Sequence, residues 1–306
     1  MGMPSLGTDN GSLDHMDTAS SSTTANATAT ASGNTTASNI TAPPLPPLPP
    51  GFINPLETGG IMLGKYKDRP YEGEPLNIII ASNSSKDMMD AEGFLIWATA
   101  LGFGVSCLGQ GDPQTIMYAN LGERNPAVKQ GSGYGLNGVL RWNYGMPEVG
   151  TCRESLEGGN HFRWFVQESP KGNAIFLAPS LEQSLANLHN IQVDGYNRGR
   201  DQIVQIATNP NGITWEGNTF NATVTWIEPG RLMNATSANI SHAEMAAPGQ
   251  PVVDGRVAVL YVQTITRSNQ NTTQNQARSQ LMYSPTWVWL MITIVFLFMY
   301  EIVECI

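Results

Sequence analysis

The densest group of chemically capable side chains lies in Gly138–Gln167, which contains the runs GVLRWNYG and EGGNHFRWFVQ. Because an imidazole oriented by a carboxylate can act as a general base, a hydrolase would use His161 with Glu157 or Asp194. No nucleophile is marked for it: GxSxG is absent, and QGSGYG lacks the strand–turn–helix setting of that motif. A lone histidine among aromatic residues is more often a hydrogen-bonded structural residue. The pattern therefore favours a protein that is not an enzyme and has no catalytic residues.

The three cysteines offer one disulfide within the polar body of the chain. Cys107 and Cys152 lie in that body, whereas Cys305 lies at the end of an apolar tail. In an oxidising compartment we expect Cys107 to pair with Cys152, and in a cytosolic protein both would be buried free thiols. A catalytic dyad of Cys107 with His161 needs a free thiol, so it is incompatible with this disulfide.

No residue spacing is typical of a metal site. The histidines are isolated, without HxxxH or CxxC spacing: His15, His161, His189 and His242. Residues 194–201 contain carboxylates and glycine but lack the alternating oxygen ligands and terminal glutamate of an EF-hand. We therefore predict no metal ion and no other cofactor, and we interpret the arginines that flank Gly199 as part of a local ion-pair network.

Aromatic residues near His161 suit either a sugar ring or a hydrophobic core. Trp142, Tyr144 and Trp164 could present flat faces to cell-wall carbohydrate. However, Phe162, Trp164 and Val166 alternate as the buried face of a strand does. The alternation favours the core, and carbohydrate binding is the alternative.

The folded body that must hold these residues opens with a β–α unit. Asn77–Ala81 is a short apolar run typical of a buried strand. Ser84 or Ser85 then predicts the N-cap of a helix that ends before Gly102. Apolar residues at helical spacing would form its buried face: Met88, Ala91, Leu95 and Ala98.

Short strand-like runs dominate the rest of the body. They occupy Val139–Trp142, His161–Val166, Ile175–Ala178 and Val257–Ile265, and the last is apolar on both faces, as in a central strand. A brief helix is predicted over Arg200–Thr208, and Gly217-Asn218 predicts a two-residue hairpin turn. The expected fold is α+β, a mainly antiparallel sheet with a few helices.

The chain outside this body divides into flanks of distinct composition. Residues 1–51 are rich in Ser, Thr, Asn and Pro and predict a disordered tail that ends in a polyproline spacer. Residues 60–267 are the expected folded domain, 268–284 a polar spacer and 285–304 a transmembrane helix. No N-terminal signal peptide is recognisable, so either the C-terminal segment directs entry to the secretory pathway or the start of the chain is misplaced.

The C-terminal segment has the length and composition of a membrane helix. Its centre, Trp287–Tyr300, reads WVWLMITIVFLFMY without a charge. About twenty residues at ~1.5 Å each span ~30 Å of hydrocarbon, and aromatic residues near both ends suit the interfaces. The alternative is a cleaved GPI-attachment signal, which would look similar.

Two signals disagree about the side of the membrane on which the body lies. Arg267 and Arg278 precede the segment and Glu301 and Glu304 follow it, which predicts a cytoplasmic body. Asn-x-Ser/Thr sequons predict the opposite side, and together with the disulfide they outweigh two arginines. We expect glycosylation within and after the body at Asn83, Asn221, Asn234, Asn239 and Asn271.

Overall charge excludes one class of partner. A net charge of −9 and a pI near 4.9 argue against nucleic acid. Charged residues make up 13% of the chain, below the usual quarter of a globular domain. Neutral polar residues fill the deficit, as on many secreted proteins.

Several separated motifs resemble those of a group of uncharacterised, mostly secreted fungal proteins. They are PLNIIIASNSSKDMM, CLGQ, RWNYG, EGGNHFRWFVQ and GYNRGRD, within residues 60–266. The resemblance implies a secreted setting and a pairing of cysteines that match Cys107 and Cys152. It implies no activity.

The sequence thus predicts a membrane-anchored, extracytoplasmic glycoprotein with a non-enzymatic surface, structural or interaction role. Its expected partners are the membrane, through the C-terminal segment, and cell-wall carbohydrate. The alternative is a secreted hydrolase that acts on cell-wall polysaccharide or peptide through His161 and Glu157.

Overall fold

The computed structural model describes residues 46–66, 68–105, 107, 117–122, 137–147, 149–169 and 172–268. Nearly all of the predicted N-terminal tail and polar spacer, the whole transmembrane segment and the sequon at Asn271 lie outside these residues. Within the described ranges, every helix is too short or too polar to cross a bilayer.

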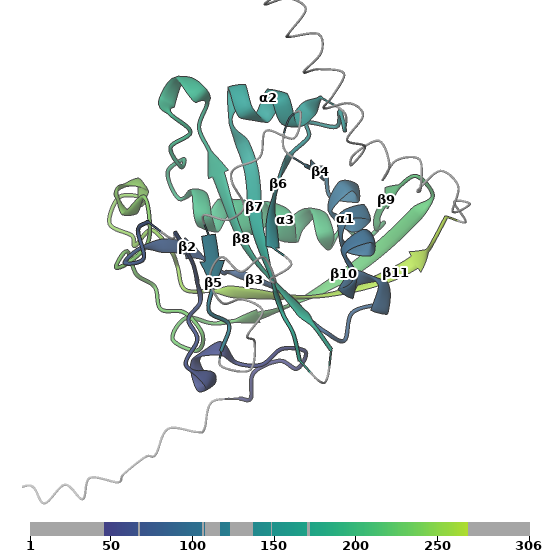
Figure 1. Cartoon of the computed structure of the whole chain (residues 1–306), viewed down its shortest axis with the longest axis horizontal. Helices are drawn as coiled ribbons and strands as arrows, with labels where there is room; N and C mark the ends of the chain where they lie inside the picture. The colour runs from purple at the N-terminus through teal and green to yellow at the C-terminus, as the bar shows by residue number, and fades with distance from the viewer. Residues whose placement is uncertain are drawn as a thin grey trace, which may run out of the picture. The chain divides into compact units, whose positions relative to one another are not determined.

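Eight strands form the main sheet, in the order β4-β6-β7-β8-β3-β11-β10-β9 (Figure 1). Their bounds are β3 (Ile78–Ile80), β4 (Phe103–Gly104), β6 (Asn137–Trp142), β7 (Gly159–Gln167), β8 (Ala174–Glu182), β9 (Ile213–Trp215), β10 (Asn218–Ile227) and β11 (Val257–Thr266). Neighbouring strands are antiparallel except β3 and β11, which are parallel. The predicted α+β fold with a mainly antiparallel sheet is therefore confirmed.

One face of this sheet packs against two helices. The sheet is curled, so that β6–β8 and β10–β11 run in different directions, and α1 (Ala91–Ala100) and α3 (Gly195–Ala207) lie in the angle between them (Figure 1). Phe162 and Leu177 join apolar residues of both helices in one core. The helix predicted over Arg200–Thr208 is α3, which begins earlier than predicted.

The opposite face of the eight-stranded sheet packs against a second, three-stranded sheet. Its order is β2 (Gly73–Pro75), β1 (Leu63–Tyr66), β5 (Met117–Ala119), with both pairings antiparallel. Phe165 belongs to this core, and a Cβ on Gly64 would lie 3.1 Å from its ring. Because side chains alternate along a strand, Phe162 and Phe165 serve opposite cores from the same strand.

The first helix is capped by Asp90 rather than by either predicted serine. The Asp90 carboxylate accepts a hydrogen bond from the N–H of Gly93 at 2.7 Å. Within this helix Phe94, Trp97 and the predicted Ala98 are buried, while Leu95 is 37% exposed. A short 3₁₀ segment, Lys86–Met89, precedes the helix. Other 3₁₀ segments are Pro55–Thr58, Leu185–Asn187 and Ala243–Met245.

The predicted hairpin is present, with its turn one residue earlier. Trp215 pairs with Asn218, so the two turn residues are Glu216 and Gly217. Their φ angles are 44° and 77°, the positive values that a type I′ turn requires. β11 is a central strand, as predicted, between β10 and β3.

Candidate functional site

A group of buried charged side chains lies where β6, β7 and β8 meet α2 (Gly150–Glu157). We call this group the charge cluster, and it consists of Glu74, Arg141, Glu154, His161, Arg163 and Glu182. The side chains of Glu154, His161 and Glu182 are 0%, 1% and 15% exposed. Charged groups of this kind are seldom so deeply buried unless they are paired, so their contacts decide what the group can do.

Strand register brings three polar residues into line across the sheet. Arg141 pairs with His161, which pairs in turn with Ser180. Arg163 and Glu182 lie two residues along β7 and β8, on the same face, because side chains alternate. Strand β7 therefore directs His161 and Arg163 toward the charge cluster, and Phe162 and Trp164 toward the helix-side core.

Glu154 reaches the cluster because two glycines allow α2 to lie close to the sheet. A Cβ on Gly150 would collide with the carbonyl oxygen of Asn143. A Cβ on Gly159 would lie 3.0 Å from Cγ of Glu154. The second glycine of the EGGN run therefore leaves space for a buried carboxylate.

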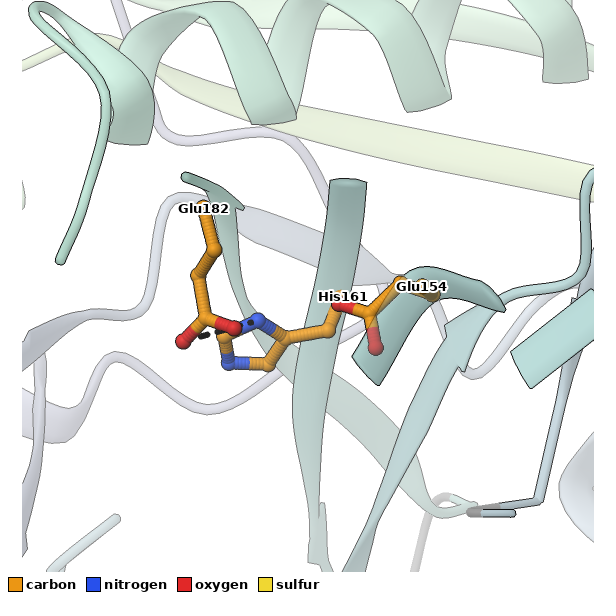
Figure 2. A group of neighbouring side chains, drawn as sticks. All are labelled: Glu154, His161 and Glu182. Atoms are coloured by element: carbon orange, nitrogen blue, oxygen red, sulfur yellow. Dashed lines mark ion pairs between the residues drawn. The ribbon is translucent and has the colours of Figure 1, made fainter. Parts of the chain in front are cut away.

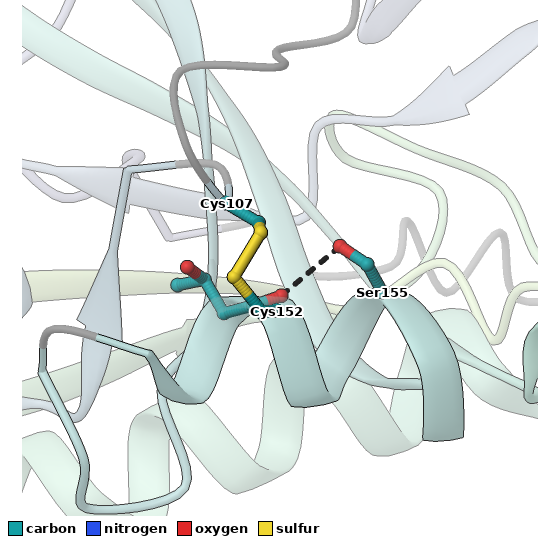
Figure 3. Close-up of a disulfide and its surroundings, with 4 residues drawn as sticks. Cys107, Cys152 and Ser155 are labelled. Carbon is teal, nitrogen blue, oxygen red and sulfur yellow. Dashed lines mark hydrogen bonds between the residues drawn. A yellow bond between two sulfur atoms is a disulfide. The ribbon is translucent and has the colours of Figure 1, made fainter.

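A disulfide fastens α2 to the chain that follows β4. Cys107 and Cys152 are joined with an S–S distance of 2.01 Å and a Cα–Cα distance of 4.6 Å (Figure 3). The predicted pairing is confirmed, and no Cys107 thiol is available to His161. Cys152 belongs to the same short helix as Glu154, so the disulfide holds the element that delivers this carboxylate.

Each arginine of the cluster is paired with a buried carboxylate. Arg141 Nη1 lies 3.0 Å from Oε2 of Glu154. Arg163 Nη1 lies 3.0 Å from Oε1 of Glu74, which also accepts a hydrogen bond from Tyr66 O–H at 2.7 Å. Removing one partner of such a pair would leave an uncompensated charge in a water-poor environment.

His161 is neutral and is held in one tautomer. Arg163 Nη1 lies 3.0 Å from Nε2, and a guanidinium can only donate, so Nε2 accepts and Nδ1 carries the proton. Nδ1 faces Oε1 of Glu182 at 3.4 Å (Figure 2). Burial, reinforced by Arg141, Arg163 and His189, lowers the pKa of His161 well below its usual value.

Glu182 keeps its proton at neutral pH. Its Oε2 lies 3.7 Å from Nδ1 of His189, so a histidine faces each of its oxygens. Burial, together with the carboxylates of Glu154 and Glu74, raises the pKa of Glu182 to about 8, although Arg141 opposes the shift. With this proton in place, the two other carboxylates of the cluster balance its two arginines.

The carboxyl groups of Glu154 and Glu182 contact the guanidinium of Arg141, which lies where a metal ion could otherwise bind. Ligand atoms of Glu154, His161 and Glu182 lie within 4.8 Å of one another, and such donors suit several divalent metals. However, Arg141 Nη1 lies 3.0 Å from Glu154 and 3.5 Å from Glu182. Arg163 also donates to His161, so arginines already contact all three candidate ligands.

Ser180 lies beside His161 but is not aligned as a nucleophile. Its Oγ is 3.4 Å from Nδ1 and 3.2 Å from Nε2 of the ring. An activated serine lies along the lone pair of one ring nitrogen, and near-equal distances to both nitrogens are incompatible with that geometry. The contact therefore contributes to packing and polar satisfaction.

The two carboxylates predicted as partners of the imidazole lie elsewhere. Glu157 is 54% exposed and pairs with Arg153 at 2.8 Å on the surface of α2. Asp194, which precedes α3, accepts a hydrogen bond from Asn197 at 2.6 Å. One helical turn before Glu157, Glu154 supplies the carboxylate that does enter the cluster.

The aromatic residues considered for sugar binding do not share one surface. Trp142 and Trp164 pack against the helix-side core. Their rings lie 5.3 Å from Phe103 and 5.1 Å from Phe94, respectively. Tyr144 instead donates a hydrogen bond to a backbone carbonyl at the end of α2. The alternation along β7 therefore indicates the core packing correctly.

Every described sequon presents its asparagine to solvent. The exposed residues are Asn83, Asn221, Asn234 and Asn239. Five other asparagines are buried, and none of them begins a sequon: Asn77, Asn143, Asn160, Asn197 and Asn218. Attached sugars at the exposed positions would project away from the body.

Sequence reasoning missed all three acidic members of the cluster, Glu74, Glu154 and Glu182. Glu182 ends the otherwise apolar run AIFLAPSLE, and a carboxylate closing a buried strand is the one local signal that could have found it. Glu74 comes from a distant strand and has no such signal. Glu154 lies one turn before Glu157 on the same short helix, and their spacing does not reveal which of the two is buried.

Geometry alone therefore describes this site. No protein-family model, curated protein or solved structure matches the chain.

Proposed function

We propose that the chain is an extracytoplasmic glycoprotein, held at a membrane by residues 285–304, whose body has a non-enzymatic surface or interaction role. The observation that carries this proposal is the exposure of the asparagine at every described sequon. The disulfide between Cys107 and Cys152 supports it, because such bonds persist in the oxidising compartments where sequons are glycosylated.

The charge cluster supports a structural role in this display. Glu154 and His161 are almost completely shielded from solvent, and the arginines already pair with the carboxylates. A polar network whose members are all satisfied fixes the packing of the elements that supply them. Partners would then meet the outer, sugar-bearing surface of the body.

The direct test uses intact cells of a eukaryotic host that express the full chain. We expect added protease and N-glycosidase each to increase the electrophoretic mobility of the protein. Asn234→Gln should remove one glycan, whereas Asn211→Gln, at an exposed asparagine outside any sequon, should change nothing. Unchanged mobility after both treatments would contradict surface display. A phospholipase that cleaves GPI anchors would release the protein only if the tail is exchanged for that lipid.

A hydrolase of cell-wall polysaccharide or peptide is a second candidate, and one observation favours it. Burial raises the pKa of Glu182 to about 8, while Glu154 is paired with Arg141 at 3.0 Å. A pair of carboxyl groups with different protonation states is the arrangement that acid–base hydrolysis uses. In this version Glu182 and Glu154 replace Glu157 as the acidic groups beside His161.

The hydrolase version is tested with the purified full chain and a panel of polysaccharide and peptide substrates. Glu182→Gln keeps the shape of the protonated acid but cannot release a proton, so it should lower activity by about 100-fold or more. Glu157→Gln is the matched control and should retain activity. An inactive wild type, or equal activity in both variants, rules out this candidate.

A further inference from the structure

Among the residues that the structure describes, none pairs with the outer edge of β10 along most of its length. β9 pairs with β10 only at Asn218, Thr219 and Phe220. Among the described residues, no backbone group is hydrogen-bonded to the outer edge of Asn221–Ile227. At ~3.4 Å per residue, this open edge is about 20 Å long.

The sequence of this strand favours pairing with another strand. β10 reads NTFNATVTWI, which contains no charge and no proline. Thr223 and Thr225 are exposed, and Val224 and Trp226 are half-buried on the opposite side. Proteins usually protect such an edge with lysine, proline or a covering element, because unpaired backbone groups recruit further strands.

Asn221 lies at the point in β10 where pairing with β9 ends. It is the first residue of β10 beyond the part that β9 pairs with, and its side chain is exposed. Its sequon, Asn221 to Thr223, lies wholly within the open edge. An N-linked glycan is bulky and hydrophilic, so at this position it would occupy the space that an added strand needs.

We propose that an N-linked glycan on Asn221 shields the open edge of β10, and that without it this edge pairs antiparallel with the same edge of a second copy. Such a contact is self-complementary under a two-fold axis. Pairing centred on Val224 places Asn221 opposite Ile227 and sets no like charges against each other. This inference rests on the proposed glycosylated, extracytoplasmic state.

The experiment compares sequon variants of the full chain, made in a glycosylating host and purified in mild detergent. Thr223→Ala removes the sequon and Thr223→Ser keeps it, so the two form a matched pair at one position. Asn221→Gln removes it independently, and Asn234→Gln removes a glycan that lies away from the edge. Light scattering during size-exclusion chromatography gives the protein mass of each particle, and glycopeptide mass spectrometry gives the occupancy of each sequon.

Wild type, Thr223→Ser and Asn234→Gln should contain one chain per particle. Thr223→Ala and Asn221→Gln should show a twofold increase in protein mass. Adding Thr225→Lys to Asn221→Gln should restore the single chain, because a charge blocks the edge. Unchanged mass in both sequon-removing variants overturns the inference, as does a wild type that is glycosylated elsewhere but not at Asn221. Absence of glycan at every sequon instead contradicts the proposed function itself.

Discussion

At one end of the eight-stranded sheet, β6, β7 and β8 contribute Arg141, His161, Arg163 and Glu182 to the largely buried charge cluster. At the other end, β10 exposes neutral side chains and contains no charge. The first end is fastened by a disulfide and by α2. The second ends in a three-residue strand that covers only part of its neighbour. The same sheet thus combines a closed, paired interior with a partly unpaired edge strand that contains no charged residue of its own.

This difference shows which contacts hold each end of the sheet in place. At the charge cluster, the buried carboxylate of Glu154 lies 3.0 Å from Arg141, and its burial makes such pairing necessary. The exposed side chains of β10 are neutral and form no ion pair among the described residues. Whether this edge pairs with another strand therefore depends on the group attached to it. Substitutions at the two ends should therefore differ strongly in their effect on stability.

The largest effect is expected from breaking a buried ion pair. Arg141→Met leaves the fully buried Glu154 without its guanidinium, which should lower the free energy of unfolding by about 3–5 kcal/mol. Arg153→Met is the matched control, because Arg153 pairs with Glu157 on the surface of the same helix. That exposed pair should contribute less than about 1 kcal/mol.

Urea denaturation of the full chain measures both changes. Equal effects of the two arginine substitutions would show that the cluster is not a closed ion-pair network. A large effect of Arg141→Met alone would establish the contrast between the inner and outer surfaces of α2.

Removing the disulfide should have the next largest effect. Replacing Cys107 and Cys152 together by serine should lower the unfolding free energy by about 2–4 kcal/mol, because the unfolded chain gains freedom. A reductant should lower the thermal midpoint of the wild type and leave that of the double variant unchanged. A wild type insensitive to reductant would mean that this bond is not formed in the protein.

The pH dependence of stability should expose the proton on Glu182. Its folded pKa of about 8 exceeds the ordinary value of 4.5, so the folded state holds a proton that the unfolded state releases between these values. Stability therefore falls as pH rises through this window. His161 acts oppositely below its ordinary pKa of 6.5, where only the unfolded chain binds a proton.

The contribution of His161 to the slope fades as pH rises above 6.5, because the unfolded imidazole loses its proton there, whereas the contribution of Glu182 persists to about pH 8. Between pH 6.5 and 8, stability should fall by on the order of 1 kcal/mol per pH unit. Glu182→Gln should flatten this dependence, and Glu157→Gln should preserve it. Urea denaturation midpoints measured between pH 6.5 and 8 test this prediction. The same pH dependence in wild type and Glu182→Gln would contradict a raised pKa of Glu182.

The smallest effect is expected on the open edge. Thr225 is exposed on β10, so Thr225→Lys should change the unfolding free energy by about 0.5 kcal/mol or less. Thermal unfolding provides the measurement. A loss comparable with that of Arg141→Met would mean that this surface is packed against something, and the contrast between the two ends would disappear.

Local patterns predicted much of the fold. The alternation along β7, the hairpin of β9 and β10 and the central strand β11 are present, because apolar periodicity and turn residues act over short distances. The first helix was capped differently since Asp90, and not a serine, meets the free N–H groups. Of the predicted buried residues, Met88 and Ala98 are buried, whereas Ala91 and Leu95 are exposed and Phe94 and Trp97 are buried instead.

The candidate site was harder to predict because long-range register creates it. His161 stood out in the sequence, but the carboxylates that surround it come from α2, β2 and β8. Choosing Glu154 over Glu157 requires knowledge of the orientation of α2, which Gly150 and the disulfide help to set. The cysteine pairing was predictable because the body contains only two cysteines.

Peptide mass spectrometry of the mature protein from a glycosylating host tests the central claim most directly. The predicted result is a linked peptide pair containing Cys107 and Cys152, together with glycans at the exposed sequons: Asn83, Asn221, Asn234 and Asn239. Free thiols and unmodified asparagines at all of these positions would contradict an extracytoplasmic glycoprotein.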